Sequence, residues 1–268
     1  MAYIPPVAMT IAGSDSGGGA GIQADLRTFS FHAVHGTSAL TCITAQNTVG
    51  VSRVDALPPE SVVAQIETVI GDIAIQSLKT GMLLNQPIIE AVVACLGKLA
   101  GISCVIDPVM VSRTGAQLID DDAIASLKQL IPLSTVLTPN RYEAEILSGQ
   151  PIQTLADMQA AARSIYELGA HAVVVKGGSF DGELRGVDVW YDGKASPITL
   201  TTDCIHTTDT HGTGCTLSAA IAANLALGYA PFEATTRAKD YVTQALGYAL
   251  RLGKGQGPVG HFYPLLGR

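Results

Sequence analysis

The sequence predicts one α/β domain over residues 1–268, with a mostly parallel central sheet and helices on both of its faces. Three observations indicate this fold. Short apolar runs alternate with amphipathic runs along the whole chain, a pattern typical of doubly wound parallel sheets. Glycine-rich or polar motifs follow several of the apolar runs, and such sheets bind ligands at the carboxyl ends of their strands. No internal repeat and no long linker divides the chain.

Composition allows a sizeable core and argues against several classes of protein. Of the 268 residues, 47% are hydrophobic and 15% are charged, and the mean hydropathy is +0.32. The net charge of −7 argues against nucleic acid as a partner, because phosphate backbones select basic faces. The five cysteines are odd in number and lack metal-ligand spacing, so neither a disulfide framework nor a structural metal is expected. With no basic leader and no bilayer-length apolar run, we expect a cytoplasmic protein that binds no membrane.

Apolar runs bounded by turn residues predict the strands, and longer runs with helical periodicity predict the helices. Proline early in a helix and glycine after its end support several boundaries, and the turn Asp192-Gly193 predicts a hairpin. In chain order, strands are expected at residues 7–12, 38–45, 51–55, 103–106, 135–138, 171–175, 188–191 and 196–201. Helices are expected at residues 22–31, 58–70, 87–100, 120–130, 154–168 and 231–252, with one more after Gly212.

The glycine-rich stretch at residues 13–21 follows the first strand and precedes the first helix. Its spacing matches neither the Walker A loop nor the dinucleotide fingerprint. It contains the Asp-Ser-Gly sequence found in trypsin-like proteases, but a strand-to-helix context is wrong for that β fold. A flexible connection is the alternative. Because the stretch is almost only Gly, Ser, Ala and Asp, it favours close approach of the backbone to a ligand.

Polar residues that follow later strands each leave two interpretations. Gln46 suits either hydrogen bonding to a small ring or a local turn. Asp107 ends a buried strand, so it needs a paired cation or a nearby metal. Asn140 and Glu143 form an N-x-x-E helix start that a capping box explains equally well. Lys176 precedes two glycines, which favours a phosphate contact over a solvent-facing side chain.

The stretch at residues 207–228 passes through the turn Gly212-Thr213-Gly214-Cys215 into a run of small residues that predicts a helix. The N–H groups and the dipole at a helix start favour an anion. No Lys or Arg occurs from residue 195 to 236, so the backbone is expected to do most of the local charge stabilisation. The helix start is also expected to lower the pKa of the Cys215 thiol. The alternative is a glycine-rich turn before a buried helix with an inert cysteine.

The chain resembles the hydroxymethylpyrimidine/phosphomethylpyrimidine kinases of thiamine biosynthesis, in the ribokinase-like superfamily, over nearly its whole length. The motifs are AGSDSGGGAGIQADL (12–26), TAQNT (44–48), DPVM (107–110), TPN-x-x-E (138–143), KGG (176–178) and DTHGTGCTLSAA (209–220). The first and last are specific, whereas KGG and N-x-x-E occur across the superfamily. The resemblance implies a ribokinase-like three-layer α/β/α fold. It also implies two transfers of the ATP γ-phosphoryl group with Mg²⁺, first to 4-amino-5-hydroxymethyl-2-methylpyrimidine and then to its monophosphate. We also expect the chain to form a homodimer.

The resemblance also assigns roles to residues. Cys215 stands where most sugar kinases of this fold have an aspartate base in a G-A-G-D motif, and it would either accept the hydroxyl proton or position the substrate. The expected catalytic residues are Cys215, Lys176 and the anion hole formed by Gly212, Thr213 and Gly214. The expected pyrimidine pocket comprises Gly13, Asp25, Gln46, Met82 and Val109. The expected nucleotide contacts are Asn140, Lys176, Thr213 and Lys239, and the expected Mg²⁺ residues are Asn140, Glu143 and Asp107.

Three other functions compete with this one. A pyridoxal kinase of the same subgroup is the nearest, but the Gln46 amide favours an aminopyrimidine because it can pair with an exocyclic amine and a ring nitrogen at once. A vitamin-binding protein without catalysis would have lost a phosphate or metal residue, and all of them are present. A thiol-nucleophile enzyme would need a histidine beside Cys215. His206 and His211 are near in sequence, but this function leaves the glycine-rich loops unexplained.

Overall fold

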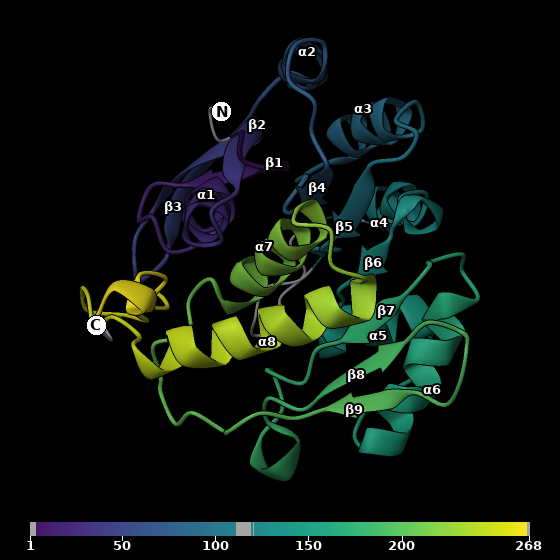
Figure 1. Ribbon diagram of the computed structural model, residues 1–268, viewed down its shortest axis with the longest axis vertical. Coiled ribbons are helices and arrows are strands. Elements are labelled where there is room, and N and C mark those ends of the chain that lie inside the picture. Colours follow the sequence, from purple (N-terminus) through teal and green to yellow (C-terminus); the bar gives the residue numbers. More distant parts are fainter. Residues whose placement is uncertain (1–3, 111–118, 120, 267–268) are drawn as a thin grey trace.

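The computed structural model describes residues 4–110, 119 and 121–266. These residues form three layers, with one nine-stranded sheet between two layers of helices (Figure 1). The strands are β1 (Val7–Asp15), β2 (His35–Gln46), β3 (Val51–Ala56), β4 (Ser77–Thr80), β5 (Ser103–Ile106), β6 (Val136–Leu137), β7 (Val173–Val175), β8 (Asp188–Tyr191) and β9 (Ile198–Leu200). The α-helices are α1 (Gly21–Phe31), α2 (Pro59–Ile70), α3 (Gln86–Leu96), α4 (Asp121–Lys128), α5 (Arg141–Ser148), α6 (Leu155–Tyr166), α7 (Thr213–Ala226) and α8 (Pro231–Gly247).

The strand order is β3-β2-β1-β4-β5-β6-β7-β8-β9. The strands from β2 through β7 in this order pair in parallel. The edge strand β3 is antiparallel to β2, and the predicted hairpin forms the antiparallel pair β8 and β9 at the other edge. The prediction of a mostly parallel sheet is therefore confirmed. Because parallel strands end at the same edge, the loops after β1, β2, β5 and β7 lie along one edge of the sheet.

Helices cover both faces of the sheet, and each face has its own apolar core (Figure 1). Helices α1, α7 and α8 pack on one face around residues such as Phe29, Trp190 and Ile221, while α2 to α6 cover the other. Helix α7 lies between α1 and α8 and against β1, β4 and β5, and it is buried along nearly all of its length. A helix in that position has no polar face, which explains its run of small apolar residues. None of the helices in the described part of the chain could cross a membrane.

Several predicted boundaries differ from the structure by a few residues; for example, β2 begins at residue 35 rather than 38, and α3 ends at residue 96 rather than 100. The differences at α8 and β1 have clear causes. The helix predicted to reach residue 252 ends at Gly247, because the chain then turns back and Leu250 N donates to Pro258 O at 2.8 Å. Strand β1 continues to Asp15, inside the predicted glycine-rich loop, since Ser14 and Asp15 pair with β2 beyond an irregularity in register. The predicted helix at 120–130 is α4, and residue 120 lies outside the described residues.

Residues 248–260, here called the C-terminal segment, lie beside the N-terminal strands (Figure 1, yellow beside purple). Gln256 N donates to Thr48 O at 3.0 Å, just beyond the end of β2. His211 N donates to Gly257 O at 3.1 Å, just before α7. The C-terminal segment therefore joins two loops that are far apart in the sequence and that both carry predicted site residues.

Candidate active site

The turn Gly212-Thr213-Gly214-Cys215 begins α7 near the carboxyl ends of the strands. Gly212 has φ of +82°, and a Cβ there would overlap the carbonyl oxygen of Gly19. Only glycine fits both conditions. Gly212 has no side chain to cap the helix, and Thr213 N donates to Thr210 O at 3.3 Å, whereas the N–H groups of Gly214 and Cys215 have no acceptor within the helix. The arrangement suits an anion, as predicted from the sequence.

Lys176 reaches this turn from the end of β7. A Cβ added to Gly214 would lie 3.4 Å from Lys176 Nζ, so the amine is next to the helix start. Lys176 Nζ also lies 2.8 Å from Asp107 Oδ1, and Ser218 Oγ on α7 donates to Asp107 Oδ2 at 3.2 Å. Burial acts to lower the pKa of Lys176, but the carboxylates of Asp107 and Glu143 hold it above its ordinary value. A charged amine is thus brought to a turn whose own sequence has no cation nearby.

The N-x-x-E motif forms a complete capping box at the start of α5. Asn140 Oδ1 accepts from Glu143 N at 3.0 Å, and Glu143 Oε2 accepts from Asn140 N at 2.8 Å. Burial raises the pKa of Glu143 to about 8, and the charge of Asp107 adds to this rise. In residues 4–110, 119 and 121–266, no three His, Cys, Asp or Glu side chains are grouped to hold a bare metal ion. Two neighbouring carboxylates instead fit Mg²⁺ that arrives with nucleotide phosphates and keeps several waters.

Sequence analysis missed a second buried lysine, Lys79 on β4. Its Nζ lies 2.8 Å from Asp25 Oδ2, and both side chains are fully buried. Burial acts to lower the pKa of Lys79, but Asp25 holds it above the ordinary value, and Cys215 contributes in the same direction. The feature of the sequence that could have revealed Lys79 is its place among the buried residues of the short strand SLKT.

Asp25 was expected to contact the pyrimidine, and the structure buries it completely. One carboxylate oxygen accepts from Lys79 and from Thr10 Oγ1, the latter at 2.6 Å. Its other oxygen, Oδ1, has no hydrogen-bond partner among the described residues. Burial raises the pKa of Asp25, while its contacts with Lys79 and Thr10 oppose that rise.

The expected lowering of the Cys215 pKa is wrong. The side chain is only partly exposed, and burial raises the pKa of its thiol, with Asp25 and Asp107 adding to the rise and Lys79 opposing it. Desolvation and two nearby carboxylates thus outweigh the helix start and the lysine. The thiol is protonated at neutral pH. His211 was considered as the histidine that a nucleophilic thiol would need, but its Nε2 lies 2.8 Å from Asp15 Oδ2 instead.

Two residues expected in the pyrimidine pocket lie together. A Cβ added to Gly13 would be 3.0 Å from Met82 Cε and 2.6 Å from Cys42 Sγ, so glycine at this position keeps the space beside Met82 free. Val109 follows β5, two residues after Asp107, and is partly exposed. All three follow the carboxyl ends of parallel strands or lie within them near that end.

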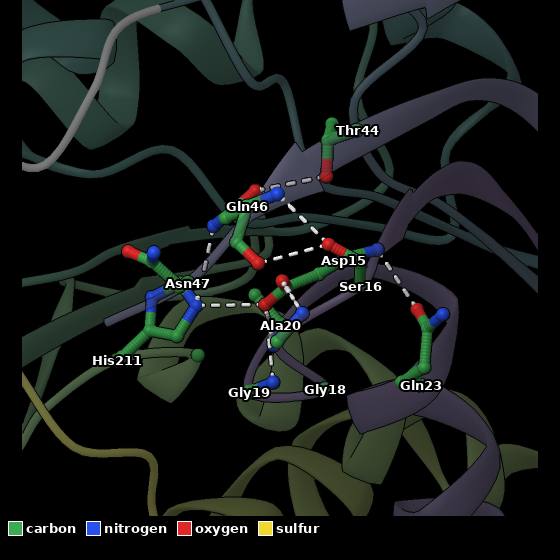
Figure 2. A network of polar contacts seen from close by, with 12 residues as sticks. Asp15, Ser16, Gly18, Gly19, Ala20, Gln23, Thr44, Gln46, Asn47 and His211 are labelled. Atoms are coloured by element: carbon green, nitrogen blue, oxygen red, sulfur yellow. Dashed lines mark hydrogen bonds and ion pairs between the residues drawn. The ribbon is translucent and has the colours of Figure 1, made fainter. Parts of the chain in front are cut away.

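Gln46 ends β2 and is held from several directions (Figure 2). Ser16 Oγ donates to Gln46 O and accepts from Gln46 N, both at 2.8 Å. The side-chain amide lies 3.2 Å from Thr44 Oγ1 and 3.4 Å from His211 Nε2. Asp15, which also accepts from several N–H groups of the glycine-rich loop, holds His211. Gln46 is thus part of a network that joins β1, β2 and the turn before α7.

Lys239, expected to contact the nucleotide, lies on α8 next to the hairpin. Its Nζ is 2.8 Å from Asp188 Oδ2 and donates to Gly186 O at 2.6 Å. An open cavity of about 530 Å³ lies next to Gly186, since the preceding residue, Arg185, is part of its lining. It is lined by Arg185, His206, Thr207, Thr208, Asp209 and Arg251.

Comparisons with known proteins agree with this fold and geometry. Two relatives are described as hydroxymethylpyrimidine/phosphomethylpyrimidine kinases. The one from Synechococcus elongatus is 61% identical over 97% of this chain and 98% of the relative. The one from Bacillus subtilis is 43% identical over 95% of this chain and 94% of the relative.

Solved structures show the same fold. An ADP complex of Bacillus subtilis pyridoxal kinase has a TM-score of 0.90 at 40% identity and covers 98% of this chain and 100% of that one. A phosphomethylpyrimidine kinase from Clostridium difficile has a TM-score of 0.80 at 42% identity and covers 90% of this chain and 99% of that one. The family model described as phosphomethylpyrimidine kinase matches residues 15–260. With that match and these identities over almost its full length, the chain belongs to the phosphomethylpyrimidine kinase family.

Proposed function

We propose that this chain transfers the γ-phosphoryl group of ATP to the hydroxymethyl group of 4-amino-5-hydroxymethyl-2-methylpyrimidine, and then transfers a second one to the resulting monophosphate. The observation that carries the proposal is the uncapped start of α7 with Lys176 Nζ beside it. Such a cluster of donors stabilises the equatorial oxygens of a migrating phosphoryl group. The descriptions of the family model and of the relative from Synechococcus elongatus support the pyrimidine as the acceptor.

In the reaction, the substrate hydroxyl oxygen attacks the γ-phosphorus while the bond from phosphorus to the ADP oxygen breaks, and the hydroxyl proton passes to an oxygen of the transferred group or to water. The N–H groups of Gly214 and Cys215 and the amine of Lys176 hold the migrating group. Asp107 and Ser218 keep that amine in place. Because the Cys215 thiol has a raised pKa, it positions the hydroxyl, and a loose transition state needs little help from a base.

Mg²⁺ would be held near Asn140, Glu143 and Asp107 through water and the nucleotide phosphates. When bound, it neutralises the charge that develops on the phosphates. Glu143 can serve in this role because a nearby cation would favour its ionised form. Its carboxylate already bonds two N–H groups, from Asn140 and Met110, which fits a water-mediated contact.

The nucleoside part of ATP would occupy the cavity lined by Arg185 and Arg251, which lies next to the turn before α7. Lys239 borders this region through its bond to Gly186 O. Two solved neighbours support nucleotide use, since a pyridoxal kinase from Bacillus subtilis was solved with ADP and one from Staphylococcus aureus with AMP-PCP and pyridoxal.

The direct test is to incubate the purified chain with MgATP and the aminopyrimidine and to follow ADP release and product mass. The monophosphate should appear first and the pyrophosphate second, and both should vanish when EDTA removes Mg²⁺. A Lys176→Met variant is the control for contaminating kinases. ADP release with pyridoxal but none with the pyrimidine would overturn the proposal in favour of pyridoxal kinase.

Pyridoxal is a second candidate substrate because two of the solved neighbours are pyridoxal kinases, at 40% and 35% identity. The residue that argues for the pyrimidine is Gln46, whose amide offers one acceptor and one donor. Pyridoxal lacks the exocyclic amine, and a pocket built on that match leaves a polar group unpaired with the wrong ligand.

The chain would act as one domain and as a homodimer in a reducing cytoplasm. One sheet runs through the chain from β1 to β9, which supports a single domain. Ile43, Val51 and Val54 are exposed apolar residues at the β2–β3 edge, which suits contact with a second copy. The five cysteines are all free, as a reducing compartment requires. Sedimentation of the wild type and of a Val51→Lys, Val54→Glu variant would test the dimer.

A further inference from the structure

We propose that His211 and Asp15 fix which way the Gln46 side-chain amide points, and that this orientation sets the choice of ring. The inference rests on the proposed function, because it concerns how the pocket reads the acceptor ring. It assigns His211 and Asp15 as positioning residues that act through Gln46. Figure 2 shows the three side chains and Thr44 in one network.

The first step is the position of the proton on His211. Asp15 Oδ2 accepts from Gly19 N at 3.0 Å and from Ala20 N at 2.8 Å, which requires it to be an acceptor. Burial acts to raise the pKa of Asp15, but the bonds from His211 and from the loop hold it below its ordinary value. Asp15 is therefore ionised. Since His211 Nε2 lies 2.8 Å from that oxygen, Nε2 carries a hydrogen.

The second step is the hydrogen on Thr44. Its Oγ1 lies 2.8 Å from Ser14 O, which can only accept, so the single hydroxyl hydrogen points there. Towards Gln46, at 3.2 Å, Thr44 can then offer only a lone pair. The group that faces Thr44 must therefore be a donor. The one hydrogen on His211 Nε2 points to Asp15, so this nitrogen has no lone pair for an amide N–H, whereas an amide carbonyl can share that hydrogen as a second, weaker acceptor.

These two requirements select one orientation of the amide. With Oε1 towards Thr44 and Nε2 towards His211, two acceptors meet on one side and two donors on the other. A half turn about the Cγ–Cδ bond removes both mismatches, because the amide nitrogen then donates to Thr44 and the carbonyl shares the hydrogen that His211 Nε2 donates to Asp15. The two ends of an amide are nearly equal in shape, so only such partners can distinguish them.

A fixed amide presents its remaining groups in a fixed order. One carbonyl lone pair stays free on the His211 side and one N–H stays free on the Thr44 side. An aminopyrimidine matches this order when its exocyclic amine lies on the His211 side and its ring nitrogen on the Thr44 side. A free amide could instead turn to suit a ring with the opposite pattern, so the network converts a general polar contact into a selective one.

The position of His211 is itself built by three segments. Its N–H donates to Gly257 O at 3.1 Å, and its carbonyl accepts from Val259 N at 3.3 Å. Gly19 makes room for the imidazole, because a Cβ there would overlap the ring. The C-terminal segment, the glycine-rich loop and the turn before α7 thus hold one side chain in place.

The test compares two rings and two substitutions of His211. The rings are the aminopyrimidine and its analogue without the 4-amino group. His211→Leu removes the donor, whereas His211→Gln keeps an N–H near the same place. In the wild type, loss of the amino group should lower kcat/KM at least about tenfold, the effect of about one buried hydrogen bond. His211→Leu should remove most of that discrimination by raising the KM for the aminopyrimidine, with little change in kcat. His211→Gln should restore much of the discrimination.

A double-mutant cycle shows whether His211 acts through Gln46. In a Gln46→Met background, His211→Leu should change the KM for the aminopyrimidine less than about twofold, since no amide remains to orient. Effects of the two substitutions that multiply would overturn the proposal, and so would an equal loss with both rings.

A spectroscopic measurement separates this inference from the proposed function. If the wild type does not phosphorylate the aminopyrimidine at all, the function fails, but the ligand-free protein still reports on the amide. The Gln46 side-chain NH₂ signals, identified by their loss in Gln46→Met, should shift in His211→Leu and return towards their wild-type position in His211→Gln. Signals that do not move in His211→Leu would overturn the inference by themselves.

Discussion

The two ends of the candidate site differ in how deeply their charged groups are buried and in the contacts that hold them. The phosphoryl end comprises residues 212–215, Asp107 and Lys176. The ring end comprises Asp15, Thr44, Gln46 and His211. At the phosphoryl end the side chains of Asp107 and Lys176 are 4% and 12% exposed, so loss of one partner strands a buried charge. At the ring end the imidazole of His211 is 27% exposed, and Asp15, although only 4% exposed, keeps three backbone N–H donors when His211 is lost. Substitutions should therefore cost far more at the phosphoryl end, while the ring end can change its partner at modest cost.

Gly214→Val should have the largest effect, because its side chain would stand between the helix start and Lys176 Nζ. We expect kcat to fall by roughly a hundredfold to a thousandfold, the usual effect of losing a preorganised donor, while the KM for the pyrimidine changes little. Gly214→Ala is the matched control, since its Cβ makes an ordinary 3.4 Å contact with Nζ. Steady-state kinetics of the folded variants check this, and normal turnover by Gly214→Val would place the anion elsewhere.

Acid should loosen the phosphoryl end through His261. Its Nε2 lies 2.9 Å from Thr216 Oγ1 in the first turn of α7, and burial lowers the pKa of His261 to about 4. The unfolded chain binds the proton near its ordinary value of 6.5, so stability from this residue is full above that pH and is lost as pH falls towards 4. The loss should reach about 3 kcal/mol of the free energy of unfolding.

Urea unfolding of the wild type and of His261→Gln at several pH values measures this effect. The variant lacks the titrating group, so the difference in stability between the two proteins should shrink between pH 6.5 and pH 4. A difference that stays constant over this range would mean that His261 is protonated in the folded protein.

Gln46→Met tests the ring end directly. Loss of the amide should raise the KM for the aminopyrimidine at least about tenfold, a loss of roughly 1.4 kcal/mol. Activity on pyridoxal should be spared or improved, because methionine offers no polar group that this ring leaves unpaired. The ratio of kcat/KM values for the two substrates is the readout, and an unchanged ratio would remove Gln46 from substrate choice.

Cys215→Ser should have the smallest effect if the thiol only positions the hydroxyl. We expect kcat to fall less than about tenfold, whereas loss of a general base costs about a hundredfold or more. Because the pKa of Cys215 is raised, the pH profile of kcat should lose no limb near neutrality. Profiles of Cys215→Ser and Cys215→Ala, taken where the chemical step limits the rate, decide between the roles. A limb that disappears in both would identify the thiolate as the base.

The comparison also shows which features could be predicted from the sequence. The glycine turn that begins α7 depends on residues that are adjacent in the chain, and the capping box of Asn140 and Glu143 depends on a spacing of three. Both were predicted, although the capping box was one of two interpretations. The parallel sheet followed from the alternation of apolar runs, which is also a local pattern.

The features that could not be predicted depend on contacts between distant residues. Lys79 and Asp25 are 54 positions apart, and His211 and Asp15 are 196 apart. The pKa of Cys215 was predicted in the wrong direction for the same reason, since burial raises it most and the two carboxylates that add to the rise come from α1 and the end of β5. The end of α8 at Gly247 is likewise set by the return of the C-terminal segment.

The C-terminal segment has a consequence for the order in which a newly made chain gains its properties. Asp15 and Gln46 leave the ribosome early, and β1 and β2 can pair while synthesis continues. The backbone of His211 is held only when Gly257 and Val259 have been added. A nascent chain therefore has most of its sheet before it can distinguish one ring from another. Under the proposed role of His211, selective pyrimidine binding needs this segment, so the ligand is expected to stabilise the finished chain rather than earlier folding intermediates.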